Sequence, residues 1–135
     1  MTPEQTKLVT DSFARIFARK APLAQTFYAE LFTAHPDLRE LFPPDMSAQY
    51  QKLTDLLAYV VRHLSRPDAL LPSVRDLAWR HVRYGALPEH YPAVGAALIA
   101  ALQKETPGTL TPEEEAAWIS AYELVAREML GATGR

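Results

Sequence analysis

The chain has 135 residues, 48% of them hydrophobic and 22% charged, which suits one domain over residues 1–135 with its own core. A net charge of −2 provides no basic field, so binding to nucleic acid or to an anionic membrane surface is not expected, and the absence of cysteine excludes disulfides, thiolate catalysis and iron–sulfur clusters. No apolar run is long enough to span a membrane, and the first residues lack the features of a signal peptide, so we expect a soluble cytoplasmic protein.

Prolines and apolar periodicity divide the chain into a series of predicted helices. Thr2-Pro3-Glu4-Gln5 and Thr111-Pro112-Glu113-Glu114 have the same form, a threonine cap followed by proline and, three residues after the cap, by Gln or Glu. Each of these segments predicts a helix start. The expected helices open after Thr2 and then cover about 22–34, a short turn at 36–41, 45–64, 67–84 in two pieces split at Pro72, 88–105, and the segment from Thr111 to Gly131.

No segment shows the alternation of a β-strand, so the chain is predicted to be all-α, with six to eight helices. The unequal helix lengths and the sharp turns at Phe42-Pro43-Pro44 and Pro72 do not suit a regular four-helix bundle. We expect instead that the helices pack at steep angles around a central pocket.

His81 is the residue that most strongly indicates a chemical site. Val74, Leu77 and Ala78 precede it by seven, four and three residues, so all four lie on one side of the predicted helix. An imidazole in an apolar stripe needs a hydrogen bond or a bound partner. Spacing alone leaves two interpretations: a histidine satisfied within the core, which is the more common case, or a metal ligand.

Two polar side chains interrupt other apolar faces. Tyr28 lies three and four residues before Leu31 and Phe32, which predicts a ring that faces the interior and needs a hydrogen-bond partner. Gln49 stands at the start of an apolar stripe that continues through Leu53. The alternatives are a phenol that reaches the surface and a surface amide at a helix start.

Several segments are similar to those of one protein family, along essentially the whole chain. They are Phe27-Tyr28-Ala29-Glu30-Leu31-Phe32 with His35-Pro36 and Leu41-Phe42, Leu70-Leu71-Pro72 through Arg80-His81, His90-Tyr91-Pro92-Ala93-Val94-Gly95, and Ala117-Trp118 with Tyr122. Together they resemble the bacterial globins, in particular single-domain haemoglobins of the flavohaemoglobin lineage, which lack the reductase domain. The resemblance implies a globin fold around a haem pocket.

The resemblance implies haem b (iron protoporphyrin IX), held noncovalently, with His81 as the proximal ligand of the iron. Tyr28 and Gln49 would form a distal polar pair, with Leu53 over the open coordination position. The other implied haem contacts are Phe42 on the porphyrin face, Lys52 and Arg80 at the propionates, and Tyr91, Val94 and Leu98 on the proximal side. Hydrogen bonds from the distal pair would retain dioxygen, so tight binding with slow release is expected. Gln49 could instead swing away, or coordinate the iron when no gas is bound.

The function implied by the resemblance is reversible binding of dioxygen and related diatomic gases, such as nitric oxide and carbon monoxide, for oxygen storage, delivery or scavenging. In the enzymatic flavohaemoglobins a glutamate late in the final helix bonds the proximal histidine. Its counterpart here falls near Thr133, beyond the expected helix end, and Glu128 is more than a turn away, so a carrier is favoured over an enzyme. The alternatives are a nitric-oxide dioxygenase that uses a separate reductase and a haem-based gas sensor that acts through a partner.

Overall fold

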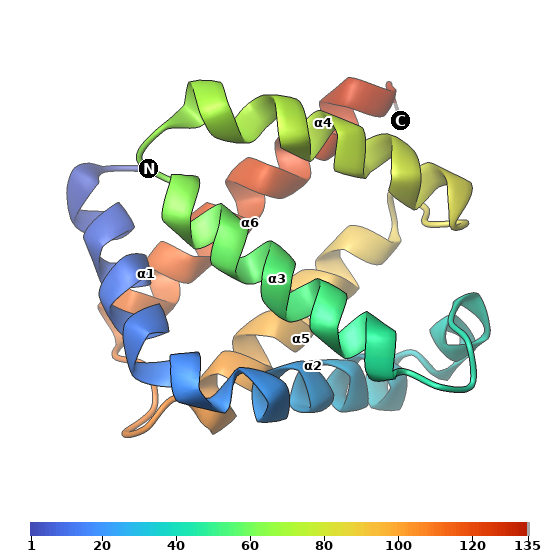
Figure 1. Ribbon diagram of the computed structural model, residues 1–135, viewed down its shortest axis with the longest axis horizontal. Helices are drawn as coiled ribbons and strands as arrows, with labels where there is room; N and C mark the ends of the chain where they lie inside the picture. Colours follow the sequence, from blue (N-terminus) through green and yellow to red (C-terminus); the bar gives the residue numbers. More distant parts are fainter. Residues whose placement is uncertain (135) are drawn as a thin grey trace.

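The computed structural model describes residues 1–134, and over this range the chain forms α-helices and short 3-10 helices without any strand (Figure 1). In chain order the elements are α1 (Pro3–Ile16), η1 (Phe17–Arg19), α2 (Lys20–Ala34), η2 (Pro36–Leu41), α3 (Ser47–His63), α4 (Pro67–Arg83), α5 (His90–Glu105) and α6 (Pro112–Thr133). The predicted all-α class with six to eight helices is confirmed. None of the helices in this range is both long and apolar enough to cross a bilayer.

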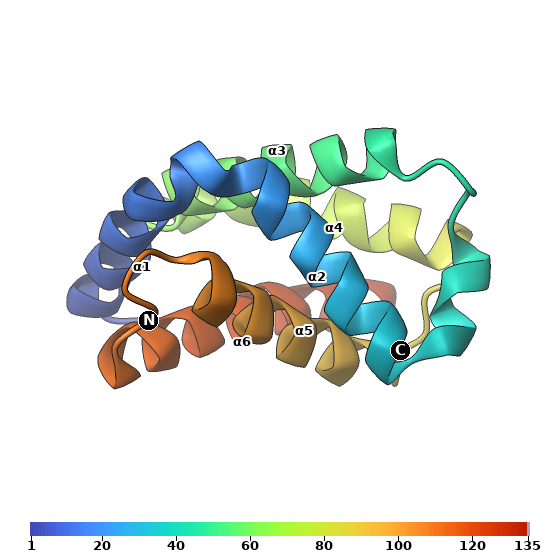
Figure 2. The ribbon, with the colours of Figure 1, turned by 90° about the horizontal axis from the view of Figure 1, so that it is seen from below.

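The helices cross one another instead of running side by side as in a parallel bundle. Seen from below, α2 runs obliquely between a layer that contains α3 and α4 and a layer that contains α5 and α6 (Figure 2). The most extensive packing joins α2 to α5, α4 to α6 and α1 to α6. By contrast, α3 and α4 touch much less, and a cavity of about 220 Å³ lies between them, lined by Leu56 and Val60 of α3 and by Leu77 and Arg80 of α4.

The hydrophobic core draws on all six α-helices. Its most deeply buried large side chains include Val9 and Ile16 of α1, Leu23 of α2, Leu70 and Val74 of α4, Leu102 of α5 and Trp118 of α6, with Leu57 of α3 beside them. The one polar group of Trp118 is satisfied inside this core, because its indole N–H donates to Ser12 Oγ at 2.8 Å. The Ser12 hydroxyl in turn donates to the carbonyl oxygen of Leu8, so this chain of bonds ties α6 to α1.

Pro72 lies inside α4, so the predicted split into two helical pieces is wrong. The helix runs without interruption from Pro67 to Arg83. A proline in the second turn removes one N–H donor and crowds the carbonyl one turn earlier, which costs stability but need not end a helix. Leu70 and Val74, on either side of Pro72, are almost completely buried, and their burial offsets that cost.

The last helix is also longer than predicted. Gly131 was expected to end it, but α6 continues to Thr133 and stops at Gly134, which takes the left-handed conformation with φ of 67°. The Gly134 N–H bonds the Gly131 carbonyl oxygen at 3.4 Å, closing the end of the helix. Either glycine could act as a stop in the sequence, and only the three-dimensional structure shows which one does.

Both predicted threonine caps are confirmed as capping boxes. The Thr2 hydroxyl accepts the Gln5 N–H, and the Thr111 hydroxyl accepts the Glu114 N–H. Glu114 also has a tertiary role, because the residue is 5% exposed and its carboxylate receives the Arg15 guanidinium of α1 at 2.5 Å. This pair joins the start of α6 to α1.

The Glu114 pair makes stability depend on pH. The hydrogen bond from Arg15 holds the pKa of the Glu114 carboxyl below its ordinary value of 4.5. The ionised carboxylate therefore stabilises the native state above about pH 4.5, and this contribution is lost as the pH falls through the lowered pKa. We expect Glu114→Gln to be less stable than the wild type near neutral pH, with the difference shrinking toward about pH 3. Urea midpoints across this range measure the effect, and a constant difference at all pH values would contradict it.

Gly95 permits close packing between α5 and α6. A Cβ at this position would lie 2.7 Å from Cε2 of Tyr122, well inside van der Waals contact. The Tyr122 ring is held in place, because its hydroxyl donates to the Tyr91 carbonyl oxygen at 2.5 Å. Gly95→Ala is therefore expected to lower the free energy of unfolding by about 1–3 kcal/mol, measured by urea denaturation.

Gly131 supplies the matched control for this substitution. It is also a helical glycine, and a Cβ there would meet nothing within 4 Å. Gly131→Ala should therefore raise the free energy of unfolding, by about 0.5–1 kcal/mol. Destabilisation of equal size by the two alanines would show that the contact with Tyr122 is not the cause.

Candidate functional site

His81 lies in the last turn of α4, partly buried, with one ring nitrogen committed to the backbone. Its Nδ1 is 2.9 Å from the carbonyl oxygen of Leu77. A carbonyl only accepts, so Nδ1 carries the proton and Nε2 keeps its lone pair. Within residues 1–134, Nε2 makes no hydrogen bond. Burial lowers the pKa of His81, which favours the neutral imidazole that a metal requires.

His63 has the same local hydrogen bond without the same surroundings. Its Nδ1 is 2.8 Å from the carbonyl oxygen of Tyr59, again one turn earlier, but its ring lies against the Tyr59 ring at 4.2 Å between centroids. The backbone bond alone therefore does not identify a ligand. The space between α3 and α4 does not distinguish the two histidines either, because it is lined by both partners, Tyr59 and Leu77. What distinguishes His81 is a looser ring environment, since its ring centroid lies 6.3 Å from that of Tyr84.

The structure brings Tyr28 and Gln49 together. Tyr28 is 5% exposed, which confirms that its ring faces the interior, and its hydroxyl accepts a hydrogen bond from Gln49 Nε2 at 3.1 Å. Burial raises the pKa of Tyr28, so the phenol stays protonated at neutral pH. Because Gln49 donates in this pair, the phenol hydrogen remains available to another acceptor.

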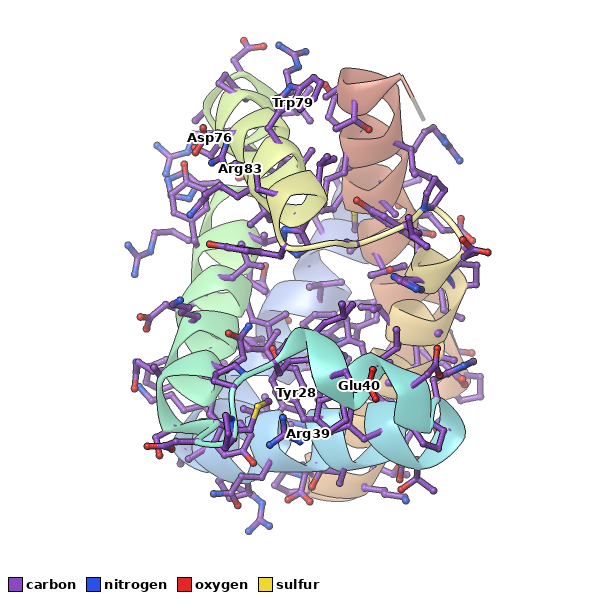
Figure 3. All side chains as sticks on the ribbon, turned by 90° about the vertical axis from the view of Figure 1, so that its right-hand side faces the viewer. Tyr28, Arg39, Glu40, Asp76, Trp79 and Arg83 are labelled. Carbon is purple, nitrogen blue, oxygen red and sulfur yellow. The ribbon has the colours of Figure 1, made fainter. Side chains whose placement is uncertain are left out.

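The tyrosine and the histidine approach the interior from different sides. Figure 3 shows Tyr28 on α2 well separated from the turn between Trp79 and Arg83 that carries His81. Tyr28 belongs to α2 and His81 to α4, so the two predicted site residues come from helices in different parts of the molecule.

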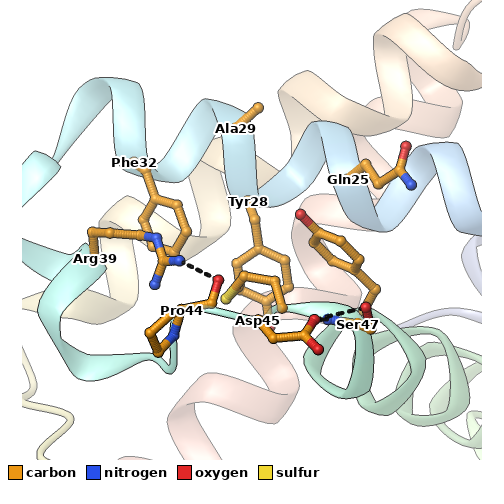
Figure 4. A pocket seen from close by; sticks show the side chains of 10 residues that line it. Gln25, Tyr28, Ala29, Phe32, Arg39, Pro44, Asp45 and Ser47 are labelled. Atoms are coloured by element: carbon orange, nitrogen blue, oxygen red, sulfur yellow. Dashed lines mark hydrogen bonds between the residues drawn. The ribbon is translucent and has the colours of Figure 1, made fainter.

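Phe42 completes an aromatic cluster beside Tyr28. Its ring centroid lies 5.4 Å from that of Tyr28 and 5.4 Å from that of Phe32, in edge-to-face arrangements in both cases. Such geometry is favourable for aromatic pairs and fixes the orientation of each ring. The cluster borders an open cavity of about 430 Å³ between α2 and the segment before α3 (Figure 4).

The remaining predicted residues differ in burial. Leu98 is 7% exposed, and Leu53, Tyr91 and Val94 are partly buried against the core, as lining residues would be. Lys52 is exposed. Arg80 is exposed too, with Nε 3.4 Å from the Asp76 carboxylate. The suggested propionate contacts of Lys52 and Arg80 therefore stay predictions.

The acidic and hydroxyl side chains near the end of α6 are occupied elsewhere. Glu128 binds the Arg75 guanidinium at 2.6 Å. Thr133 lies within the helix and not beyond its end, which corrects the expectation, and its hydroxyl donates to the Met129 and Leu130 carbonyl oxygens. Over residues 1–134, the hydrogen-bond partner of the His81 ring is accordingly a backbone carbonyl and not a carboxylate.

Sequence reasoning missed Arg39. The structure places its guanidinium against the Phe42-Pro43-Pro44 segment, where it contacts three carbonyl oxygens. The available signal was an arginine three residues before Phe42 and two consecutive prolines. Prolines have no N–H, so the carbonyls around them depend on side-chain donors.

The sequence is similar to that of one known protein family. The sequence profile of the globin family matches residues 25–129. A flavohemoprotein of Deinococcus radiodurans is 35% identical over 134 residues, which cover 97% of this chain and 33% of that protein. A flavohemoprotein of Rhizobium meliloti is 29% identical, with 97% and 34% covered. The chain thus spans about a third of the length of these curated relatives.

Two solved structures share the fold. A bacterial globin from Campylobacter jejuni superposes with a TM-score of 0.86 at 23% identity, covering 98% of this chain and 96% of its own. An engineered carbene transferase from Rhodothermus marinus has a TM-score of 0.83 at 27% identity, with 94% and 89% covered. The family profile covers well over half of the chain, and the solved structures have the same arrangement of helices. The chain therefore belongs to the globin family.

Proposed function

We propose that this chain binds haem b noncovalently through His81 and holds dioxygen reversibly, for storage, delivery or scavenging. The observation that carries the proposal is the partly buried Tyr28–Gln49 hydrogen bond, together with a His81 whose Nδ1 bond to Leu77 leaves Nε2 available. Membership of the globin family and similarity to flavohemoproteins support haem as the bound group.

Two groups of residues would have separate roles: His81 would bind the iron of the haem, and Tyr28 with Gln49 would bind the gas. When bound, the haem supplies an iron that one imidazole and one diatomic gas can share. His81 is already oriented by its bond to Leu77, so its Nε2 lone pair is fixed in direction before any group arrives. The protonated Tyr28 phenol would be free to donate its hydrogen to a diatomic ligand, because Gln49 donates to the phenol oxygen and so helps to orient it.

Apolar side chains would keep water from the same space. Phe42 packs against Tyr28, and Leu53, one turn after Gln49 in α3, packs against the core. Water that reached a bound gas would compete for the hydrogen bond from Tyr28 and promote oxidation of the iron. Exclusion of water therefore favours slow release and a long-lived reduced state.

Absorption spectroscopy tests the proposal directly. The recombinant protein, reconstituted with haem, should show a Soret band in the ferric, ferrous and oxygenated states, with a reversible change on removal of dioxygen. A protein that shows no Soret band after reconstitution would exclude haem binding. Spectra that do not respond to dioxygen or carbon monoxide would exclude gas binding.

A second candidate is conversion of nitric oxide to nitrate with electrons from a separate reductase. It is favoured by the flavohemoprotein relatives and by the Rhodothermus marinus structure, which is described provisionally as a nitric oxide dioxygenase. We rank it second because His81 bonds a carbonyl and not a carboxylate, which leaves the imidazole a weaker electron donor. Rapid mixing of the oxygenated protein with nitric oxide, followed by turnover with added reductase, separates the two functions.

A further inference from the structure

Arg39 makes three side-chain hydrogen bonds close to the candidate site. Its Nη1 donates to the carbonyl oxygens of Phe42 at 3.3 Å and of Pro43 at 2.9 Å, and its Nη2 donates to that of Pro44 at 3.0 Å. Figure 4 shows the last of these bonds from the side of the cavity. One guanidinium therefore holds three consecutive carbonyl groups.

Few other hydrogen bonds hold the Phe42–Pro44 segment in place. Pro43 and Pro44 have no N–H, and within the described chain no backbone N–H donates to the three carbonyls that Arg39 binds. A guanidinium suits the task, because its donors lie in one plane as a rigid fork, whereas an ammonium is a single point. The Phe42–Pro44 part of the segment is thus organised around one side chain, and Asp45 then fixes the start of α3 by accepting the Ser47 N–H at 3.0 Å.

The same side chain also contacts the aromatic cluster. Arg39 Cζ lies 5.5 Å from the centroid of the Phe32 ring, in cation–π geometry. Phe32 and Tyr28 both pack against Phe42, whose carbonyl Arg39 binds. Any shift of the Phe42 backbone would move the ring that borders Tyr28, and with it the phenol that Gln49 bonds.

We propose that Arg39 is a positioning residue, which fixes the Phe42–Pro44 segment and through Phe42 sets the direction of the Tyr28 hydroxyl. The effect on gas release rests on the proposed function, whereas the effect on the segment does not. Arg39 is partly buried at the edge of the cavity and has no direct part in binding the gas. Its influence passes through the segment and the aromatic rings.

The segment itself is tested by hydrogen–deuterium exchange on the whole chain, with and without added haem. Arg39→Met keeps an apolar stem against Phe32 and removes every donor. We expect exchange of the Phe42 and Ser47 amides to be about tenfold faster in Arg39→Met. Arg39→Lys should give an intermediate value, because an ammonium can serve some of the carbonyls. Arg127→Met is the control, since Arg127 is exposed on α6 and loses the same charge.

The effect on Tyr28 is tested by the rate of oxygen release and the C–O stretching band of the carbon monoxide complex. Arg39→Met should release dioxygen about tenfold faster and broaden that band, but should change the release rate less than about twofold in a Tyr28→Phe background. A variant that is merely less stable would keep the wild-type band in its folded fraction. Arg39→Lys, which retains a cation and a donor, should restore part of the wild-type rate.

Three results judge the proposal. Unchanged exchange at Phe42 and Ser47 in Arg39→Met, or in Arg39→Lys if the first variant does not fold, would overturn it, whether or not the protein binds haem. Equal acceleration of oxygen release with and without the Tyr28 hydroxyl would overturn the link to Tyr28. Faster exchange in a chain that binds no haem would support the role of Arg39 in the segment while excluding the proposed function.

Discussion

Replacement of His81 by glycine is expected to reduce the affinity for haem more than about a hundredfold, because loss of even an outer-shell partner of a metal ligand costs ten- to a hundredfold. In His81 of α4, Nδ1 bonds the Leu77 carbonyl oxygen, which leaves Nε2 available to bind a metal. Haem titration followed in the Soret region measures the change. Added imidazole should enter the space left by the side chain and restore much of the wild-type spectrum.

His63→Gly is the matched control for this experiment. His63 also lies at the end of a helix and bonds a carbonyl one turn earlier, but its ring packs on Tyr59. Removal of the His63 side chain should leave haem affinity within about twofold of the wild type, because His63 and His81 share no hydrogen-bond partner. Spectra of His81→Gly that match the wild type without imidazole would point to a different ligand.

Replacement of Tyr28 by phenylalanine should accelerate the release of dioxygen about ten- to a hundredfold. A hydrogen bond to a charged acceptor contributes about 1.5–3 kcal/mol, and about 1.4 kcal/mol corresponds to a factor of ten. The substitution keeps the ring that packs against Phe42 and removes only the hydroxyl that Gln49 bonds. Stopped-flow displacement of dioxygen by carbon monoxide gives the rate.

Tyr59→Phe provides the corresponding control. Its hydroxyl lies 2.9 Å from Ser73 Oγ, on the outer side of the contact between α3 and α4. Loss of this bond should affect stability slightly and leave gas release unchanged. An unchanged rate in Tyr28→Phe would refute the distal role of Tyr28, and a smaller increase in Gln49→Leu than in Tyr28→Phe is expected if the amide acts through the phenol.

Local rules predicted most of the secondary structure. The two threonine caps work as predicted, because a cap depends on residues only three positions apart. Pro72 and Gly131 were misjudged because both residue types are tolerated inside helices when tertiary packing favours continuation, and that packing involves residues distant in sequence. The periodicity of the apolar residues alone does not show whether tertiary packing outweighs the tendency of proline or glycine to end a helix.

The candidate site was predicted less completely than the fold. Periodicity placed His81 and Tyr28 on inward faces, but the local hydrogen bond of His81 does not single it out, because His63 makes the same bond. The pairing of Tyr28 with Gln49 spans two helices and follows from how α2 and α3 meet. Arg39 escaped notice because its role depends on the path of the backbone around two prolines, which no periodicity encodes.

The contact of Gly95 with Tyr122 sets a rule for the evolution of this protein. A side chain at position 95 and a full ring at position 122 cannot occupy the same space. Lineages that acquire alanine or serine at position 95 should therefore carry a smaller or differently shaped residue at position 122. The order of the two changes should be constrained, because a smaller residue at position 122 leaves a cavity, whereas a larger one at position 95 creates a clash.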